Sequence, residues 1–425
     1  MRMVNGIDWN RALAPRASKM RASEIRELLK LLDQPGIISF AGGIPDPNLF
    51  PYEVIRAAFV DLLSDREKAA QPLQYSTSEG YPPLRRWIAS HMATLGVPCE
   101  IDNIVVTSGS QQALDFLGKL FLGANHTALV MAPTYLGALQ AFNPYEPRYD
   151  RLDDAPNGTP AWAYRTRAEA AGGRVAMAYV VPDFANPTGE TLDIEARQRL
   201  LKLASELDIP LIEDGAYQEL RYEGVPLPSC LSLDVRRSEH IDRTRTVYCG
   251  TFSKTVAPGL RIGWICAARE LVQKIVLTKQ GADLHSATLN QMVMARVGEL
   301  GYAAQVSKVA DAYAKRRDAM LDALDRHMPP GMSWTKPQGG MFIWATLPPE
   351  IDGAALLAEA LRSEGVAFVP GAAFFFDGSG RNTIRLNFSL QSEPVMDEGL
   401  RRLGALIRRQ PGVGATRIHG RKTMK

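Results

Sequence analysis

The chain has 425 residues, of which 46% are hydrophobic and 22% charged, a composition typical of a soluble globular protein with two or three domains. Its net charge of +3 comes from a basic tail, because residues 410–425 carry four Lys and Arg residues and no acid, which leaves −1 for residues 1–409. The four cysteines lack metal-ligand spacing, and no apolar run suits a secretion signal or a membrane span. We therefore expect a cytoplasmic protein that binds no nucleic acid, no membrane and no metal.

The N-terminal part of the chain predicts an amphipathic helix followed by a glycine-containing loop. A serine cap opens the helix over residues 23–32, and a short strand follows over residues 37–40. The next loop contains Gly42 and Gly43. Adjacent glycines permit the backbone to approach a ligand closely, but they equally permit a plain tight turn.

From residue 53 onwards, helices alternate with short apolar strands, the pattern of a mainly parallel sheet covered by helices. We expect strands over residues 104–107, 128–131, 174–181, 209–214 and 246–249, and helices over residues 53–64, 113–121 and 195–207, from Pro82 onwards, and through most of residues 268–325. In an open α/β sheet of this kind, ligands bind at the carboxyl ends of the strands.

Five side chains with binding chemistry lie at or just past the ends of these predicted strands. They are Ser110, Tyr135, Asn186, Asp214 and Lys254. Taken one at a time, each has an ordinary explanation, because a serine can cap a helix, an aromatic residue can lie on a rim, and Asn-Pro can form a turn. Because the ends of parallel strands share one edge of the sheet, the five together predict one ligand site.

The stretch from Thr251 to Arg261 is the densest of these motifs. Lys254 follows a buried strand, where an amine is costly to desolvate and is seldom found without a function. Arg261, with the hydroxyls of Thr251 and Ser253, would form an anion site suited to phosphate. A lysine beside a phosphate site predicts a Schiff-base lysine that holds pyridoxal phosphate (PLP). A polar loop with surface charges is the alternative when the stretch is taken alone.

The last part of the chain predicts a separate, smaller unit. Pro329, Pro330 and Gly331 predict a boundary before it. Within this α+β unit, residues 383–389 alternate between apolar and polar side chains, as in a half-buried strand. Arg385 lies on the polar face of that strand, where it could simply be solvated.

In this order, the motifs resemble those of fold-type I PLP-dependent enzymes, and most specifically the class I and II aminotransferases of the 2-aminoadipate/kynurenine aminotransferase II branch. The resemblance extends from about Ile25 to Leu406. The matching segments are Ser39 to Pro45, Tyr75 to Leu84, Ser108 to Gln112, Asn186 to Gly189, Asp214 to Tyr217, Ser253 to Arg261 and Arg385 to Phe388.

The resemblance implies an α/β fold of the PLP-dependent transferase type. A large domain would hold a mainly parallel seven-stranded sheet covered by helices, beside a smaller α+β domain. We expect four segments: residues 1–50 as an N-terminal helix and cover segment that joins the small domain, 51–325 as the large PLP-binding domain, 326–409 as the small C-terminal domain, and 410–425 as a disordered basic tail.

The resemblance also implies a role for each motif residue around PLP. Lys254 would bond the cofactor and move a proton between it and the substrate Cα, and Asp214 would pair with the pyridine nitrogen. Tyr217 and Asn186 would hydrogen-bond the ring hydroxyl. The other cofactor ligands would be Ser110, Gln111, Tyr135, Thr251, Ser253, Arg261 and Tyr75.

Substrate and subunit contacts follow from the same resemblance. Arg385 would grip the substrate α-carboxylate with a bidentate fork, assisted by Asn186, and Gly43 would let the backbone approach the substrate. Arg26 aligns with a position that can meet a distal carboxylate, although a salt bridge to a neighbouring glutamate would explain it equally well. Tyr75 would reach the phosphate of the neighbouring subunit, so the active unit should be a symmetric homodimer.

We therefore expect PLP-dependent transamination, by a ping-pong mechanism, between an L-amino acid and a 2-oxo acid. The expected donors are 2-aminoadipate, glutamate, and aromatic or branched-chain amino acids, and 2-oxoglutarate is the family's usual acceptor. A PLP-dependent β-lyase or decarboxylase on the same fold is an alternative, although Arg385 and Tyr75 favour transamination. An aminotransferase-like regulatory domain fused to a DNA-binding module is disfavoured, because only about forty residues precede Gly42 and the folded part is not basic.

Overall fold

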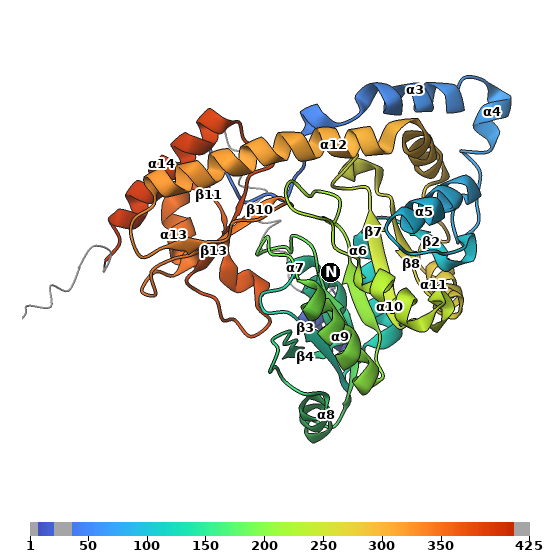
Figure 1. Ribbon diagram of the computed structural model, residues 1–425, viewed down its shortest axis with the longest axis horizontal. Coiled ribbons are helices and arrows are strands. Elements are labelled where there is room, and N and C mark those ends of the chain that lie inside the picture. Colours follow the sequence, from blue (N-terminus) through green and yellow to red (C-terminus); the bar gives the residue numbers. More distant parts are fainter. Residues whose placement is uncertain (1–6, 21–35, 412–425) are drawn as a thin grey trace, which may run out of the picture.

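The computed structural model describes residues 7–20 and 36–411, which form a larger body around a seven-stranded sheet and a smaller body at the C-terminal end (Figure 1). The long helix α12 (Thr288–His327) runs along both bodies. The predicted helix over residues 23–32 and residues 412–425 of the predicted tail lie outside the described residues. Among the residues described, no helix combines the length and the apolar character that crossing a membrane requires.

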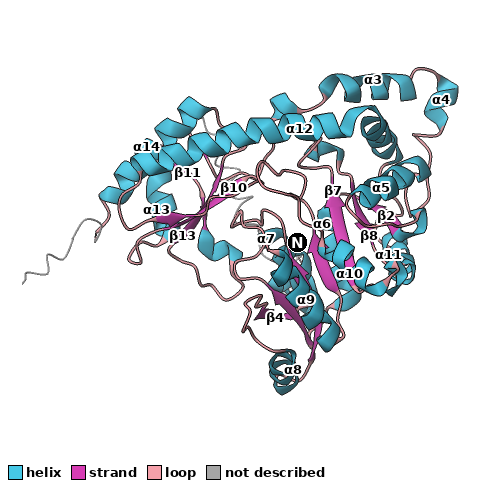
Figure 2. Cartoon of the chain, viewed as in Figure 1, coloured by secondary structure: helices cyan, strands magenta, loops and turns pink. Residues whose placement is uncertain are grey.

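The large sheet has the strand order β2-β8-β7-β6-β5-β3-β4. Its strands are β2 (Ile104–Thr107), β3 (His126–Val130), β4 (Arg148–Arg151), β5 (Arg174–Val180), β6 (Leu211–Asp214), β7 (Thr246–Thr251) and β8 (Gly263–Cys266). Neighbouring strands are parallel, except that β8 lies antiparallel between β2 and β7. The predicted mainly parallel seven-stranded sheet is thus confirmed, and six strands end at one edge (Figure 2).

Helices cover both faces of this sheet. Alternate strand residues face opposite layers: Tyr179 and Ile212 pack in a cluster with α6 and α7, whereas Leu129 and Leu211 pack in another with α8 and α9. The helices are α1 (Trp9–Ala12), α3 (Tyr52–Leu62), α4 (Arg66–Ala70), α5 (Pro82–Thr94), α6 (Ser110–Phe121), α7 (Leu136–Phe142), α8 (Ala161–Ala170), α9 (Ile194–Leu207), α10 (Cys230–Ser238), α11 (Arg269–Gln280) and α12.

The smaller body contains an antiparallel sheet of order β12-β13-β10-β9, and α14 packs along α12. Its elements are β9 (Ser333–Trp334), β10 (Phe342–Thr346), α13 (Gly353–Glu359), β12 (Val369–Pro370), β13 (Thr383–Asn387) and α14 (Glu393–Arg408). The N-terminal strand β1 (Ile38–Ser39) pairs in parallel with β11 (Val366–Ala367) of this body. The predicted segment boundaries remain predictions, and α12 continues past residue 326 to His327.

Short helical turns connect these elements. They are η1 (Pro15–Lys19), η2 (Pro47–Leu49), η3 (Ile101–Asn103), η4 (Asn143–Tyr145), η5 (Ile241–Arg243), η6 (Pro258–Leu260), η7 (Ala360–Glu364) and η8 (Gly371–Phe374). All are 3-10 turns except η7, which is a π-helix. The turn η6 lies within the loop that follows β7, so it helps to place the lysine of the predicted site.

The structure corrects some of the predicted elements. The helix expected over residues 53–64 is α3, and a second, short helix that was not predicted, α4, follows it, because the Asp65 side chain accepts a hydrogen bond from Lys68 N and starts a new helix. The strand expected to be half-buried is buried on both faces, because its polar face meets the larger body, where Arg385 has hydrogen-bond partners. The strands β4 and β8 are not predicted, since one is polar and the other only four residues long.

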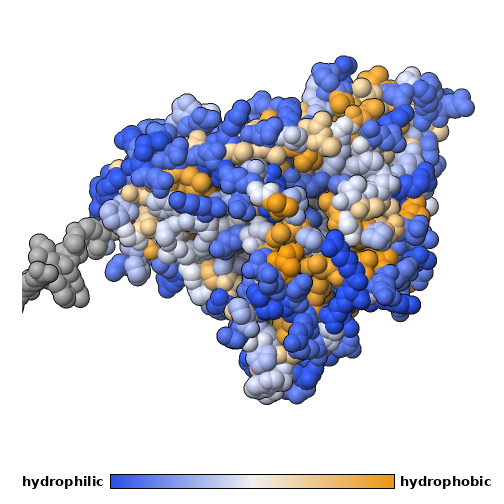
Figure 3. Space-filling view, viewed as in Figure 1, coloured by the Kyte–Doolittle hydropathy of each residue, from blue (hydrophilic) through white to orange (hydrophobic). Residues whose placement is uncertain are grey.

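Several large apolar side chains are exposed on α3 and in the segment after it. Tyr52 and Val60 on α3 and Leu73 beyond it are exposed for 65%, 60% and 70% of their surface. Figure 3 shows hydrophobic residues gathered over α3 on the viewed face. Contiguous exposed apolar residues of this kind mark interaction surfaces more often than ordinary surface.

Candidate active site

Four of the five residues predicted at the strand ends line one cavity of about 430 Å³ at the carboxyl edge of the large sheet, and the fifth, Asn186, lines a second cavity. Predicted residues that line it are Ser110, Gln111, Tyr135, Asp214, Tyr217, Thr251, Ser253, Lys254 and Arg261. They come from β6, β7 and the loops and helix starts that follow β2, β3, β6 and β7. The topology therefore brings together side chains that are as far apart in the sequence as Ser110 and Arg261.

Lys254 lies in the loop after β7 and points its amine into this cavity. Its Nζ donates a hydrogen bond to Gly43 O at 3.0 Å and lies 6.0 Å from the centre of the Tyr217 ring. Burial lowers the pKa of Lys254 to about 8, and the positive charges of Arg385 and Arg261 act in the same direction. An amine with a pKa in this range can accept and release a proton near neutral pH, which an ordinary lysine does poorly.

Asp214 ends β6 and is only 3% exposed. Its Oδ2 accepts a hydrogen bond from the Tyr179 hydroxyl at 2.9 Å, whereas its Oδ1 has no hydrogen-bond partner among the described residues. Burial raises the pKa of Asp214 to about 6, opposed by the hydrogen bond from Tyr179, by the backbone N–H of Ala216 and by the charge of Lys254. A buried carboxylate oxygen without a partner is costly, so it suits a ligand that brings a proton or a positive charge.

Three polar side chains form a hydrogen-bonded chain that ends at Tyr217, in the wall of this cavity. The Arg385 Nη1 donates to Asn186 Oδ1 at 2.7 Å, and Asn186 Nδ2 donates to the Tyr217 hydroxyl at 3.4 Å. Burial raises the pKa of the Tyr217 hydroxyl, so it remains protonated and can still donate a hydrogen bond. The structure thus brings together the residues predicted for the ring hydroxyl and for the substrate carboxylate.

Arg385 is a buried guanidinium held from several sides. Its Nη2 donates to Ala41 O at 2.7 Å, and its Cζ lies 4.2 Å from the Phe342 ring centre and 5.1 Å from that of Phe374. Its Nε has no hydrogen-bond partner within residues 7–20 and 36–411. Burial lowers the pKa of Arg385 to about 10, which still leaves it charged at neutral pH. The two rings fix the plane of the guanidinium group. Because no carboxylate of the described residues neutralises its charge, Arg385 is suited to bind an anionic ligand.

The opposite end of the cavity collects donors suited to an anion. The first turn of α6 presents Ser110, and Thr251 Oγ1 and Ser253 Oγ are hydrogen-bonded at 2.9 Å. Arg261 donates through Nη2 to Ser108 O at 3.2 Å. Gly109 has φ +81°, and a Cβ on it would come within 2.5 Å of the Arg261 guanidinium, so glycine is needed for this close approach. A helix start, two hydroxyls and an arginine form a phosphate site.

Together these groups fit the predicted cofactor. The unpartnered Asp214 oxygen suits a protonated pyridine nitrogen, and Lys254 lies in the same cavity for the aldehyde. The arginine and hydroxyl donors at the other end suit the phosphate. The donor chemistry therefore matches both ends of PLP.

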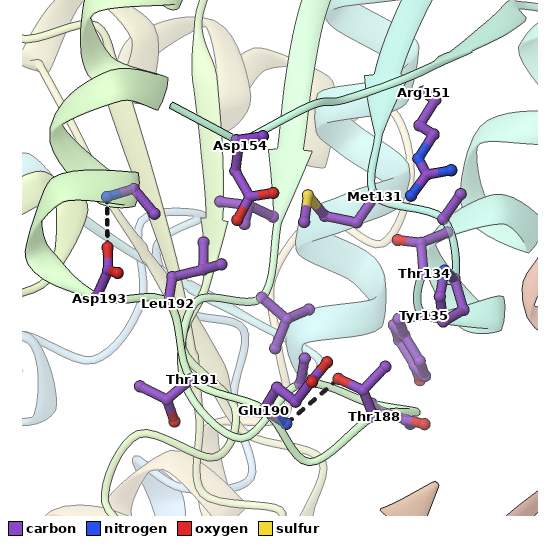
Figure 4. A pocket seen from close by; sticks show the side chains of 18 of the residues that line it. Met131, Thr134, Tyr135, Arg151, Asp154, Thr188, Glu190, Thr191, Leu192 and Asp193 are labelled. Atoms are coloured by element: carbon purple, nitrogen blue, oxygen red, sulfur yellow. Dashed lines mark hydrogen bonds between the residues drawn. The ribbon is translucent and has the colours of Figure 1, made fainter. Parts of the chain in front are cut away.

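A second cavity, of about 460 Å³, adjoins the first (Figure 4). The two share Tyr135 and Val181 in their walls, and Asn186 lines the second one. Tyr135 comes just before α7, and its hydroxyl donates to Gln111 Oε1 at 3.4 Å. Tyr135 is therefore positioned between the cavities, consistent with the predicted place beside a flat ring.

Three predicted residues stand apart from the rest. Gly43 contributes its carbonyl oxygen to Lys254, so it does approach the cavity through its backbone. Tyr75 is 78% exposed, packs edge-on against His285 and does not line the cavity of its own chain. Arg26 lies outside the described residues.

The sequence analysis does not identify Tyr179, Phe342 or Phe374. Tyr179 lies inside the apolar run of β5, and only the pairing of β5 with β6 brings its hydroxyl to Asp214. The two phenylalanines belong to the smaller body and meet Arg385 through tertiary packing. Tyr179 could have been found from one signal, its position one residue before the end of a buried strand.

The chain is similar to known aminotransferases along most of its length. Residues 36–403 match the family model described as aminotransferase class I and II. The chain is 42% identical to aromatic-amino-acid aminotransferase 1 of Thermococcus litoralis, over 95% of this chain and 96% of the relative. It is 40% identical to 2-aminoadipate transaminase of Thermus thermophilus, over 95% of this chain and 98% of the relative. The crystal structure of Pyrococcus horikoshii kynurenine aminotransferase in complex with PMP is similar, with a TM-score of 0.85, 42% identity, and coverage of 94% of this chain and 98% of that one.

Proposed function

Since this chain belongs to the class I and II aminotransferase family and is a PLP-dependent aminotransferase of fold type I, we propose that it transfers the amino group of an L-amino acid to a 2-oxo acid by a ping-pong mechanism in the cytoplasm. The proposed donors are 2-aminoadipate, glutamate, and aromatic or branched-chain amino acids, with 2-oxoglutarate as acceptor. The names of the similar proteins, which mention aromatic amino acids, 2-aminoadipate and kynurenine, support this choice.

One observation carries the proposal: a lysine with a lowered pKa shares a cavity with a buried carboxylate oxygen that lacks a partner. When bound, PLP supplies a conjugated ring that takes up the electrons released as the substrate Cα loses its proton. Asp214 would hold a positive charge next to its Oδ1, which keeps the ring nitrogen protonated. Lys254 Nζ would accept the Cα proton and deliver it to the cofactor carbon.

Arg385 would orient the substrate for this proton transfer. It is buried, charged and fixed between two rings, and its Nε has no partner within the described residues. A guanidinium binds a carboxylate through two parallel hydrogen bonds, which fixes direction as well as position. Asn186 would connect this clamp to Tyr217, so that the substrate carboxylate and the ring hydroxyl are positioned by one hydrogen-bonded chain.

The phosphate of the cofactor would be held by Ser110, Gln111, Thr251, Ser253 and Arg261. The dipole at the start of α6 and the Arg261 charge both favour an anion at this end. Tyr135 would lie against the ring face. These contacts would keep the cofactor in place while its bond to Lys254 is exchanged for a bond to the substrate.

The active unit is proposed to be a symmetric homodimer. Tyr75 projects from the surface and does not line the cavity of its own chain. The exposed apolar residues Tyr52, Val60 and Leu73 lie on α3 and in the segment just before Tyr75 (Figure 3). Burying this surface against a second copy would bring Tyr75 to the neighbouring phosphate site, as the family resemblance implies. Cross-linking and light scattering of the purified protein would test the dimer.

The proposed reaction is tested by the visible spectrum of the purified protein. Single L-amino acids are added without any 2-oxo acid, and a productive donor should convert the cofactor band in one turnover. Adding 2-oxoglutarate should then restore the original band. Borohydride reduction before the amino acid is added should fix the cofactor mass on the peptide that contains Lys254, and Lys254→Ala should lose this label.

The same experiment separates the alternatives. Release of pyruvate and ammonia without an acceptor would show a β-lyase, and release of carbon dioxide would show a decarboxylase. Glutamate and leucine should be compared in wild type and in Arg26→Ala, because unchanged relative rates would refute a role of Arg26 in selecting acidic donors. A protein that carries no cofactor band after purification with PLP would refute the assignment of Lys254.

A further inference from the structure

The loops that carry Tyr217 and Lys254 each place a second polar residue away from the cavity. Glu219 follows Tyr217 by two residues, Thr255 follows Lys254 directly, and neither lines the cavity. Both contact the same side chain, the buried Tyr302 of α12. None of the steps proposed above uses this arrangement.

The contacts form a short chain of hydrogen bonds. The Tyr302 hydroxyl donates to Glu219 Oε2 and lies 3.1 Å from Thr255 Oγ1. A phenol has a single proton, so while Tyr302 donates to an ionised Glu219, Thr255 must donate to Tyr302. Gln305 of the same helix donates to Thr255 O at 3.1 Å and to Leu49 O at 2.9 Å. Thr255, the neighbour of Lys254, is thus held through both its hydroxyl and its carbonyl.

The Tyr302 ring itself is fixed. It packs edge-on against Trp87 at 5.1 Å and against Phe252 at 5.7 Å, between ring centres. Gly301, the residue before it, has φ +151° and interrupts the helical geometry of α12. Side chains other than glycine rarely adopt this backbone angle. The interruption sets the direction of Tyr302 independently of the first part of α12.

Glu219 can change its charge near neutral pH. Its side chain is 19% exposed, and burial raises its pKa to about 7. The titratable groups that face it are Tyr302 from α12, His91 from α5 and Tyr248 from β7. His91 Nε2 lies 3.4 Å from Glu219 Oε1, but burial lowers the pKa of His91 to about 4, so it offers no positive charge at pH 7. Protonation of Glu219 replaces the charged acceptor at the end of this chain by a neutral carboxyl group, which accepts a weaker hydrogen bond.

We propose that Glu219 and Tyr302 are positioning residues for Lys254. The chain from Thr255 through Tyr302 to Glu219 ties the lysine loop to the loop of Asp214 and Tyr217, so that the amine meets the cofactor aldehyde in one fixed place. This inference rests on the proposed role of Lys254. Ionised Glu219 can only accept, so it holds the chain in the direction that fixes Thr255, whereas protonated Glu219 binds Tyr302 more weakly and no longer imposes that direction.

The test compares two variants on the same helix. Tyr302→Phe removes the hydroxyl of the proposed chain, and Tyr313→Phe removes another enclosed hydroxyl, which accepts a hydrogen bond from Asp46 N at 3.0 Å. Cofactor is stripped from each protein, and the PLP dissociation constant, the single-turnover rate with an amino acid and the thermal unfolding temperature are measured. Tyr302→Phe should weaken PLP binding and slow the turnover by about five- to tenfold, the equivalent of one buried hydrogen bond, whereas Tyr313→Phe should change both by less than about twofold.

Two further variants keep the proposal testable if Tyr302→Phe folds poorly. Thr255→Ser retains the hydroxyl and should bind PLP like wild type. Thr255→Val lacks the hydroxyl and should lose as much PLP affinity as Tyr302→Phe. The double variant Tyr302→Phe/Thr255→Val should bind PLP no more weakly than either single variant, because both substitutions break the same chain of hydrogen bonds. Equal effects of Tyr302→Phe and Tyr313→Phe, or additive losses in the double variant, would overturn the proposal.

A pH series distinguishes positioning from a general loss of stability. The affinity of wild type for PLP, divided by that of Glu219→Gln, should rise from about 1 at pH 6 to about fivefold at pH 8, because only wild type gains the ionised acceptor. A ratio that stays constant over this range would refute the role of Glu219. PLP affinity is measured without a substrate, so these comparisons remain decisive even if no amino acid converts the cofactor and the proposed transamination fails.

Discussion

Replacing Asp214 by asparagine should stabilise the cofactor-free protein and disable the enzyme. The carboxylate is 3% exposed, its Oδ1 has no hydrogen-bond partner in the part of the chain that the structure describes, and its Oδ2 accepts one hydrogen bond from Tyr179. Without a cofactor, the negative charge is therefore buried with little compensation. With PLP bound, the same charge would face the ring nitrogen. The two states of the protein should respond to the substitution in opposite directions.

The size of the first effect follows from the pKa of Asp214. Burial raises this pKa from 3.8 to about 6, above its value in the unfolded chain, so the ionised side chain lowers the stability of the folded state. This penalty is absent below about pH 4, grows between about pH 4 and pH 6, and is complete above that. Two pKa units correspond to about 3 kcal/mol of stability that the substitution should restore. Asparagine accepts a weaker hydrogen bond from Tyr179 than the carboxylate does, which should cost the variant about 1 kcal/mol. Cofactor-free Asp214→Asn should therefore be about 2 kcal/mol more stable than wild type at pH 8.

Denaturant unfolding of the cofactor-free proteins at pH 5, 6, 7 and 8 measures this difference. Asp183→Asn is the matched control, because Asp183 is equally buried but accepts hydrogen bonds from Arg197 at 2.8 Å and Arg221 at 3.2 Å. Its removal leaves guanidinium groups uncompensated and should lower the free energy of unfolding by about 3 kcal/mol. A burial penalty at Asp214 is refuted if the cofactor-free Asp214→Asn variant is less stable than wild type at pH 8. It is also refuted if the difference in free energy of unfolding between the two proteins does not grow from pH 5 to pH 8. In single-turnover assays with PLP, the same variant should be at least about a hundredfold slower.

Three further substitutions test other parts of the site. Arg385→Lys should raise the KM for the amino donor about thirtyfold with a smaller change in kcat, because an ammonium cannot reproduce the bidentate fork, and steady-state kinetics would show it. Gly109→Ala should weaken PLP binding about tenfold or more in an equilibrium titration, since the new Cβ would meet Arg261 and φ is +81°; unchanged affinity would contradict the assigned phosphate end. Tyr179→Phe should raise the pKa of Asp214 further, so the pH below which PLP affinity falls should move upwards, and an unmoved pH profile would exclude this support.

The site residues at strand ends could be predicted because chain direction alone places them. Asp214 and Lys254 follow apolar runs, and parallel strands bring such positions to one edge whatever the details of packing. Tyr179 could not be assigned, because its function depends on which strand lies beside β5 and in what register. Sequence patterns report burial and periodicity, and they do not report which elements become neighbours.

Contacts between the two bodies were the least predictable part. Arg385 looks like a solvated strand residue in sequence, yet it is buried between Phe342 and Phe374 and bonded to Asn186. Glu219 likewise lies in a short turn with no pattern of its own, and the path of α12 brings the Tyr302 hydroxyl to it. In both cases, a polar residue acquires its role from an element far away in the chain. The roles of all the site residues, Tyr75 and Arg26 among them, stay predictions.

The antiparallel strand β8 bears on the order in which this enzyme folds. Because β8 returns directly beside β7, with Thr251 opposite Gly263, the lysine loop is closed by a local hairpin. The clamp of Arg385 and Asn186, by contrast, joins residues 199 positions apart. Closing a long loop costs more chain entropy and slows folding, so the lysine loop should acquire protection from hydrogen exchange earlier during refolding than the clamp. A newly made chain would then have the local framework of its cofactor lysine before it can hold a substrate.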